Sequence, residues 1–443
     1  MSMKETIFLF TLFLTKQDWN HSPVNDATKG MMPPNVNDNL LPQVTPAKIV
    51  RNEDTRVEVE EVTECDCREV RFGIGDAIFS SLVVAPQAVS VWRGTWGIME
   101  LHPQWFPHAQ IYVLGIVIHV CFALIRSQLL ARSKNAWGEG RAGRWLRERV
   151  LSRVYTYIFL LACIMHWRGG WWLLDGLIDA IFPDRDNPRR AFLLAGITVL
   201  LYCCIASLRS SRNMLAPPYF LVTDGKEPTY IFATRFQKKS SRETALYILD
   251  CVFSVTVVGS LVVFVWRGSW ALLDIFLYPH DQVKSFWTSL VVGYSLVILT
   301  FAAQAPVRWA VAKLHGAPRL LLADVYHLIS FFATVNVWRG IWGLLDVYFF
   351  PDSPKLSNWS SHIVSLVLLI LLNCSNSILV RGVYIDAEEP AGDCVEFPCH
   401  YLRLFFQKER VKKRRKTVET SSAANARKVE EASVPLQIPE EKV

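Results

Sequence analysis

The sequence predicts an all-α polytopic membrane protein with eight transmembrane helices, built from two parallel four-helix repeats. Three observations predict it. Of the 443 residues 51% are hydrophobic, and the charged 20% sit in blocks between long apolar runs. A pattern around Trp-Arg-Gly recurs four times, and Lys and Arg gather in alternate connections. Since a helix needs about 20 apolar residues to cross a bilayer, this arrangement excludes a secreted mini-protein, a disordered chain and a single soluble enzyme.

Eight apolar windows are the candidate spans, and they divide the chain into five regions. The windows are residues 77–96, 109–125, 154–171, 191–208, 251–270, 285–305, 325–342 and 363–380. The regions are a flexible cytoplasmic N-terminal arm (1–72), a first four-span half (73–208), a cytoplasmic connection (209–245), a second four-span half (246–380) and a cytoplasmic basic tail (381–443).

The distribution of Lys and Arg predicts the orientation. The connections after the second, fourth and sixth windows hold 17 basic residues, and the opposite connections hold five besides the motif Arg. Short connections rich in Lys and Arg stay on the cytoplasmic side, so we expect both termini in the cytoplasm and the motifs on the outer face. Residues Ile7–Leu14 resemble the apolar core of a signal peptide, but no small-x-small cleavage site follows them.

The four copies of the motif share Trp-Arg-Gly-x-Trp and an acid four residues later. They comprise Trp92, Arg93, Gly94, Trp96 and Glu100; Trp167, Arg168, Gly169, Trp171 and Asp175; Trp266, Arg267, Gly268, Trp270 and Asp274; and Trp338, Arg339, Gly340, Trp342 and Asp346. The first and third copies are 174 residues apart and the second and fourth 171. This spacing indicates a duplicated four-span unit, each unit being two related hairpins. An even number of spans keeps both halves parallel.

The motif suggests a ring of charge pairs. On a helix the two Trp share a face, and Gly lets a neighbouring helix approach closely. The Arg and the acid of one copy lie two helical turns apart, so that either long side chains or the acid of a neighbouring repeat must close the gap. We therefore expect a pseudo-fourfold ring of Arg–acid pairs near the outer leaflet, with Glu100 in place of Asp changing little. A folding keystone without a ligand is favoured over a transport or binding role.

Other polar residues carry weaker hypotheses. His119, Asp324 and His327 are a possible polar pathway, although buried polar residues more often hold helices together. Asn358 begins a glycosylation sequon on the predicted outer face. No catalytic motif occurs, so we expect no enzyme, no metal, no cofactor and no nucleic-acid partner.

The cytoplasmic segments suggest three further features. Tyr219–Phe236 is expected to form a short hairpin around Asp224-Gly225. Tyr401–Lys416 mixes apolar and basic residues, which is typical of a segment that binds anionic lipid or calmodulin, or of a solvated flank. Four Cys near the inner surface are expected to be unmodified thiols, with palmitoylation or a zinc site as alternatives: Cys65, Cys67, Cys394 and Cys399.

The eight spans, cytoplasmic termini and repeated Trp-Arg-Gly-x-Trp motif resemble the Fuseless family of invertebrate membrane proteins, over roughly residues 70–410. The resemblance implies a presynaptic plasma-membrane protein that supports calcium-channel localisation and neurotransmitter release. Its partners would be the lipid bilayer and voltage-gated calcium-channel complexes or active-zone proteins. The alternative is a secondary transporter or channel with a solute path between the two halves.

Overall fold

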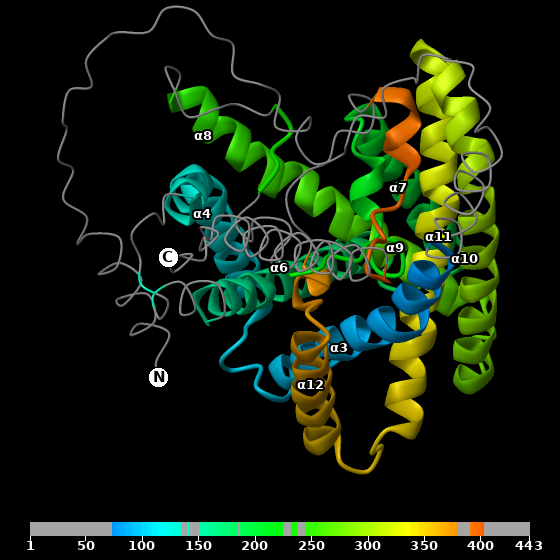
Figure 1. The fold of residues 1–443 in the computed structure, drawn as a ribbon. Coiled ribbons are helices and arrows are strands. Elements are labelled where there is room, and N and C mark those ends of the chain that lie inside the picture. Colours follow the sequence, from blue (N-terminus) through cyan, green and yellow to red (C-terminus); the bar gives the residue numbers. More distant parts are fainter. Residues whose placement is uncertain are drawn as a thin grey trace, which may run out of the picture. The chain divides into compact units, whose positions relative to one another are not determined.

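A computed structural model describes residues 73–134, 140, 143, 150–184, 187–224, 232–236, 244–379 and 390–402. These residues lie in one compact unit of the chain, Glu61–Val443. Within the described ranges every regular element is helical (Figure 1). The all-α prediction is therefore confirmed, whereas the N-terminal arm, Ile7–Leu14 and most of the tail lie outside the described residues.

The described residues form eight long helices, of which two contain a π-helical turn. The first runs Gly73–Leu101 and includes η1 (Ser80–Val84) and α3 (Ala85–Leu101). The fifth runs Thr244–Phe276 through α8 (Thr244–Phe253), η4 (Ser254–Gly259) and α9 (Ser260–Phe276). The others are α4 (His108–Lys134), α6 (Ser152–Ile181), α7 (Pro188–Ser207), α10 (Gln282–Lys313), α11 (Gly316–Tyr348) and α12 (Pro354–Leu371).

Six of these helices are long and apolar enough to cross a membrane. They are Gly73–Leu101, His108–Ala131, Pro188–Ser207, Thr244–Phe276, Gln282–Lys313 and Gly316–Tyr348. The remaining two, α6 and α12, correspond to the predicted windows 154–171 and 363–380. They do not contain an 18-residue stretch that is as apolar as those of the other six. Six candidate spans identify a membrane protein.

The predicted window 363–380 is misplaced, because α12 ends at Leu371. Asn373 takes a left-handed φ of 58°, and the N–H of Cys374 donates to the Leu369 carbonyl at 2.8 Å. This is a Schellman helix end. At the corresponding point after α7, Arg209 has a φ of 51°, and Ser210 donates to Ile205 at 3.1 Å. After both ends the chain turns into a short 3₁₀ helix: η3 (Ser211–Met214) and η5 (Ser375–Ile378).

Three of the motif-bearing helices pack mainly against the long helix that precedes them in the sequence, and the first packs against the last. The main pairs are α4 on α6, α7 on α9, α10 on α11 and α12 on α3. Figure 1 shows the last pair, in which the eighth helix returns to the first. The sequence predicts hairpins that pair the first span with the second and the third with the fourth. The structure instead pairs the second with the third, the fourth with the fifth, the sixth with the seventh and the eighth with the first. As a result, two of the four pairs join the two halves.

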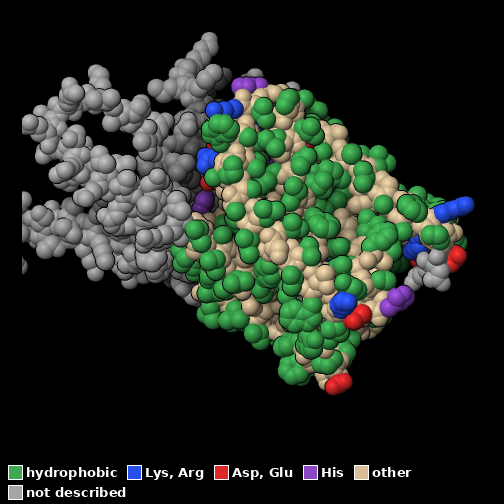
Figure 2. All heavy atoms as spheres, turned by 90° about the vertical axis from the view of Figure 1, so that its right-hand side faces the viewer, with side chains coloured by type: hydrophobic (Ala, Val, Ile, Leu, Met, Phe, Trp, Pro, Cys, Tyr) green, Lys and Arg blue, Asp and Glu red, His purple; other side chains and the backbone are tan. Residues whose placement is uncertain are grey.

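The outer surface of the helices is apolar. Figure 2 shows a face on the side of α10 where hydrophobic side chains predominate and charged ones are confined to a few places. Phe192 of α7, Ile298 of α10 and Leu371 of α12 are each more than two-thirds exposed, at 78%, 71% and 75%. Large exposed apolar surface is costly in water, and this surface is suited to lipid.

Candidate functional site

The first tryptophans of the four motif copies meet in a closed ring. Trp92 contacts Trp167 and Trp338, with ring centroids 5.2 and 5.7 Å apart. Trp266 contacts the same two rings at 5.4 and 5.5 Å. All four contacts are edge-to-face, the arrangement that the aromatic quadrupole favours, and all four rings are buried. They fill the space between α3, α6, α9 and α11.

The second tryptophans form another closed ring one helical turn further along. Trp96 contacts Trp171 and Trp342 at 5.1 and 5.9 Å, and Trp270 contacts Trp171 and Trp342 at 5.4 and 5.9 Å. Two stacked rings follow from the i, i+4 spacing, since residues four apart share one face of a helix.

Three of the four expected Arg–acid pairs are formed, and each joins neighbouring copies of the motif. In every pair the guanidinium Nε donates to the carboxylate Oδ1: Arg93–Asp346 at 2.7 Å, Arg267–Asp175 at 2.7 Å and Arg339–Asp274 at 2.9 Å. The three Arg side chains are 6%, 21% and 3% exposed, whereas their acids are 52%, 42% and 46% exposed. The guanidinium groups of Arg93 and Arg339 are therefore buried between helices and that of Arg267 is partly buried, whereas the carboxylates are about half exposed.

Serine pairs hold two of the arginines, and the sequence analysis did not identify them. Arg339 donates to Ser285 and Ser289 of α10 at 2.8 and 2.7 Å. In the same way, Arg93 donates to Ser357 and Ser361 of α12 at 2.9 and 3.0 Å. The sequence pattern that could have predicted these partners is Ser-x-x-x-Ser, which occurs after the proline that follows the third copy and again after the one that follows the fourth. Serines four residues apart share one face of a helix.

The fourth pair, between Arg168 and Glu100, is not formed. Glu100 accepts a hydrogen bond from Trp96 Nε1 at 2.7 Å, four residues earlier on its own helix. Arg168 is buried and donates through Nη1 to the Phe106 carbonyl at 3.0 Å. Its Nε has no hydrogen-bond partner among the described residues. The expectation that Glu in place of Asp changes little was therefore wrong, because the extra methylene lets Glu100 fold back onto Trp96.

The motif glycines are the points where the helix pairs touch. A Cβ built on Gly94 would lie 2.5 Å from the backbone of α12, and one on Gly169 would lie 2.7 Å from the backbone of α4. One on Gly340 would lie 2.8 Å from α10, and one on Gly268 would meet Thr198 of α7. Only glycine permits this approach. The glycine thus selects the packing partner of each motif helix.

A cavity of about 630 Å³ lies over the second tryptophan ring. Its lining includes the four motif acids, three motif arginines and the four second tryptophans: Glu100, Asp175, Asp274, Asp346, Arg168, Arg267, Arg339, Trp96, Trp171, Trp270 and Trp342. We call this cavity the vestibule. Its volume is within the range of ligand pockets, about 300–1,000 Å³.

Polar segments cover the opposite end of the tryptophan rings. The Nε1 atoms of Trp92, Trp266 and Trp338 donate to the carbonyls of Ile378, Met214 and Pro217 at 2.9, 3.0 and 2.8 Å. Met214 ends η3 and Ile378 ends η5, so the same contact occurs in both halves. The first tryptophan ring therefore has backbone acceptors from the inner segments below it.

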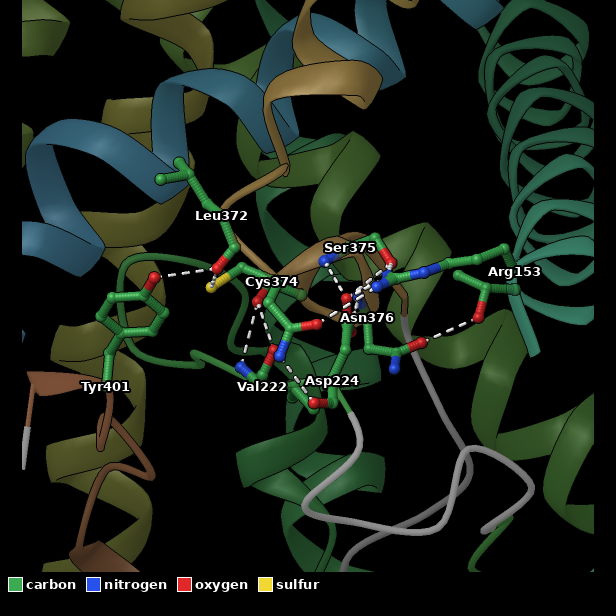
Figure 3. A network of polar contacts seen from close by, with 11 residues as sticks. Arg153, Val222, Asp224, Leu372, Cys374, Ser375, Asn376 and Tyr401 are labelled. Carbon is green, nitrogen blue, oxygen red and sulfur yellow. Dashed lines mark hydrogen bonds and ion pairs between the residues drawn. The ribbon is translucent and has the colours of Figure 1, made fainter. Parts of the chain in front are cut away.

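One buried carboxylate joins these inner segments (Figure 3). Asp224 accepts the N–H groups of Ser375 and Asn376 at 2.9 and 2.8 Å, and it forms an ion pair with Arg153. The Asn373 side chain also donates to the Asp224 carbonyl at 2.8 Å. We call this network the inner latch. It connects the segment after α7 to the segment after α12 and to the start of α6.

The hairpin expected over Tyr219–Phe236 is not formed by its described residues, 219–224 and 232–236. Leu221 makes an isolated parallel bridge with Cys399 instead. Asp224, which the sequence places at the turn of this hairpin, belongs to the inner latch, and its carboxylate accepts from another segment. Local turn chemistry alone could not predict that long-range partner.

The candidate polar pathway divides into two separate places. Ser211 donates to Asp324 Oδ1 at 2.7 Å and lies 2.9 Å from His327 Nδ1, and His327 Nε2 lies 3.1 Å from the Cys394 carbonyl. His119 instead packs against Phe159, with ring centroids 4.6 Å apart. It lines a cavity of about 40 Å³ that contains neither of the other two residues. Asp324 and His327 thus serve in a packed network, and the structure does not bring His119 to them.

The other predicted sites lie in buried positions. The thiols of Cys394 and Cys399 are buried, and Cys399 Sγ lies 3.3 Å from the Tyr219 carbonyl. The described residues hold no group of ligands suited to a metal, and Cys65 and Cys67 lie outside them. Asn358 is only 9% exposed and faces Gly97. Glycosylation there stays a prediction, and this position counts against it.

Comparison with known proteins identifies the family. A family model described as Fuseless matches residues 72–379, which is more than half of the chain. The chain therefore belongs to the Fuseless family, as the repeated motif indicated. No curated protein and no solved structure matches it.

Proposed function

We propose that this member of the Fuseless family is a non-enzymatic membrane protein of the synapse that supports presynaptic calcium-channel localisation and neurotransmitter release. It acts from the presynaptic plasma membrane, with channel complexes or active-zone proteins as partners. Family membership and the six apolar helices support the membrane part of this proposal. The observation that favours an organising role over a transport role is the packing of the two stacked tryptophan rings, which we call the tryptophan axis.

A solute path between the two halves would run where the tryptophan rings lie. Trp92, Trp167, Trp266 and Trp338 are buried and in mutual contact. The inner latch covers the same axis with paired polar groups. A transport path needs a water-accessible route lined by polar groups, so the packed axis favours an organiser over a transporter or channel.

In this proposal all eight helices cross the membrane as two parallel four-helix repeats, and both termini are cytoplasmic. α6 and α12 qualify as spans because each packs along a helix that is itself apolar enough to cross, α4 and α3. The basic connections and tail are then cytoplasmic. The tail binds anionic lipid or calmodulin through its mixed apolar and basic segment.

The test compares two activities of one chain. Animals lacking the gene should show dispersed calcium channels and reduced evoked release, and the wild-type chain should restore both. A chain that ends at Leu402 should reach the membrane but restore neither, if the tail recruits the partner. In parallel, purified protein in proteoliposomes should show no solute flux. Flux that Asp324→Asn abolishes, with normal channel distribution in the mutant animals, would overturn the proposal in favour of transport.

A further inference from the structure

We infer that the vestibule binds a small zwitterion, a molecule of the amino-acid class that carries an ammonium group and a carboxylate. The inference concerns the end of the axis opposite the inner latch and does not depend on the proposed synaptic role. It rests on the cavity of about 630 Å³, on the exposure of three motif acids and on two buried donor atoms that have no acceptor among the described residues.

The acids provide a site for the ammonium group. Asp175, Asp274 and Asp346 line the vestibule, and each is roughly half exposed although its Oδ1 accepts from a motif arginine. The cavity therefore presents the negative end of each pair, with the guanidinium behind it. Charge-assisted hydrogen bonds from an ammonium group are favourable in this position.

The side of the vestibule that the second motif copy forms provides a site for the carboxylate. Arg168 lines the vestibule and is 4% exposed, and its Nε has no acceptor among the described residues. The Nε1 of Trp171, in the same wall, also lacks one. A buried donor without a partner costs about 1–3 kcal/mol. Both donors belong to residues that line the vestibule, so an acceptor from outside the chain that binds on this side would give them the missing partner.

The charge arrangement excludes simpler ligands. A cation alone would leave Arg168 Nε and Trp171 Nε1 without an acceptor among the described residues, and an anion alone would approach four carboxylates. A zwitterion satisfies both sides at once, with its carboxylate at Arg168 and its ammonium at the aspartates. The second tryptophan ring beneath it offers aromatic surface for a side chain.

The difference between Glu100 and the aspartates of the other copies creates this asymmetry. Because Glu100 reaches Trp96 Nε1, it leaves Arg168 available. A shorter acid at this position would be unable to fold back as far and would pair with Arg168, as the aspartates pair in the other three copies. Glu100→Asp should therefore close the anionic half of the site while it adds an ion pair.

The experiment uses the full chain in lipid nanodiscs. Proteinogenic amino acids are screened by thermal shift, and the affinity of the strongest binder is measured by calorimetry. Its carboxyl amide and its N-acetyl derivative keep the side chain but remove one charge each. We expect the free amino acid to bind at least about tenfold more tightly than either derivative, because each derivative loses a charge-assisted contact.

Two variants and a control complete the test. Glu100→Asp should keep or raise the unfolding temperature and weaken binding about tenfold, and Arg168→Gln should weaken binding of the free acid but not of its amide. Arg190→Gln removes a motif-independent pair with Asp179, outside the vestibule, and should leave affinity unchanged. The inference is overturned if no amino acid binds, if the blocked derivatives bind equally well, or if Glu100→Asp binds as the wild type does.

Discussion

The Nε of Arg339 donates to Oδ1 of Asp274 at 2.9 Å and so joins the fourth copy of the motif to the third. The same two atom types join the third copy to the second and the first to the fourth. Three motif arginines thus reach the acid of the preceding copy, and the series is open only between the second copy and the first, where Arg168 and Glu100 do not pair. The repeat is thus held together by contacts between copies.

Removal of Arg339 should be more damaging than removal of Arg267. Arg339 is 3% exposed and also binds Ser285 and Ser289, whereas Arg267 is 21% exposed. We expect Arg339→Ala to lower the free energy of unfolding by about 3 kcal/mol and Arg267→Ala by about 1 kcal/mol. Reversible unfolding in detergent measures both. No loss in either variant would mean that the pairs do not hold the ring together, and equal losses would contradict the greater contribution of the buried Arg339.

The motif glycines should not tolerate a methyl group. Gly340→Ala would place a Cβ 2.8 Å from Leu290 of α10, and overpacking of this kind costs about 1–3 kcal/mol. Gly196 of α7 is the matched control, because nothing lies within 4 Å of a Cβ built there. Gly196→Ala should be neutral or stabilising by up to about 1 kcal/mol. If both substitutions had the same effect on unfolding, α10 would not approach α11 as described.

The inner latch should open when its carboxylate is neutralised. Asp224 accepts two backbone N–H groups and the Arg153 guanidinium, so Asp224→Asn leaves a largely buried arginine without its counter-charge. Hydrogen exchange should then accelerate in residues 372–379 and 208–224. Asp393→Asn is the control, since its pair with Arg308 is exposed, at 45% for both side chains. Unchanged exchange in Asp224→Asn would show that the latch does not hold these segments.

The thiol of Cys399 should be inert in the folded protein. Burial raises the pKa of Cys399 to about 12, so the reactive thiolate is nearly absent at pH 8. Iodoacetamide at pH 8 should leave Cys399 unlabelled until the chain is denatured, as mass spectrometry can check. The folded form holds this proton above the pH at which the unfolded chain releases it, so this group destabilises the fold as pH rises from about 9 toward 12. Rapid labelling of the native protein would contradict the described burial.

The sequence predicted the repeat and a ring of Arg–acid pairs, but the two-turn spacing left open whether each pair forms within one copy or between neighbouring copies. It did not predict which neighbour pairs, since that depends on the helix that each motif glycine admits. The end of α12 at Leu371 was missed because Leu372 and Cys374 are apolar, and only the left-handed Asn373 between them ends the helix. Glu100 accepts from Trp96 instead of pairing with Arg168 because its side chain is one methylene longer than that of Asp. A sequence pattern that treats Asp and Glu alike does not predict this difference.

The central claim is that the eight long helices of the described residues form one closed ring, in which the last helix, α12, lies against the first, α3. The most direct measurement is a disulfide between Gly97→Cys and Asn358→Cys. A Cβ built on Gly97 would contact the Asn358 side chain, which is close enough for a disulfide. With a protease site introduced between residues 225 and 231, the cleaved double variant should run as one species until it is reduced, and each single variant as two fragments. Two fragments from the oxidised double variant would contradict the closed ring.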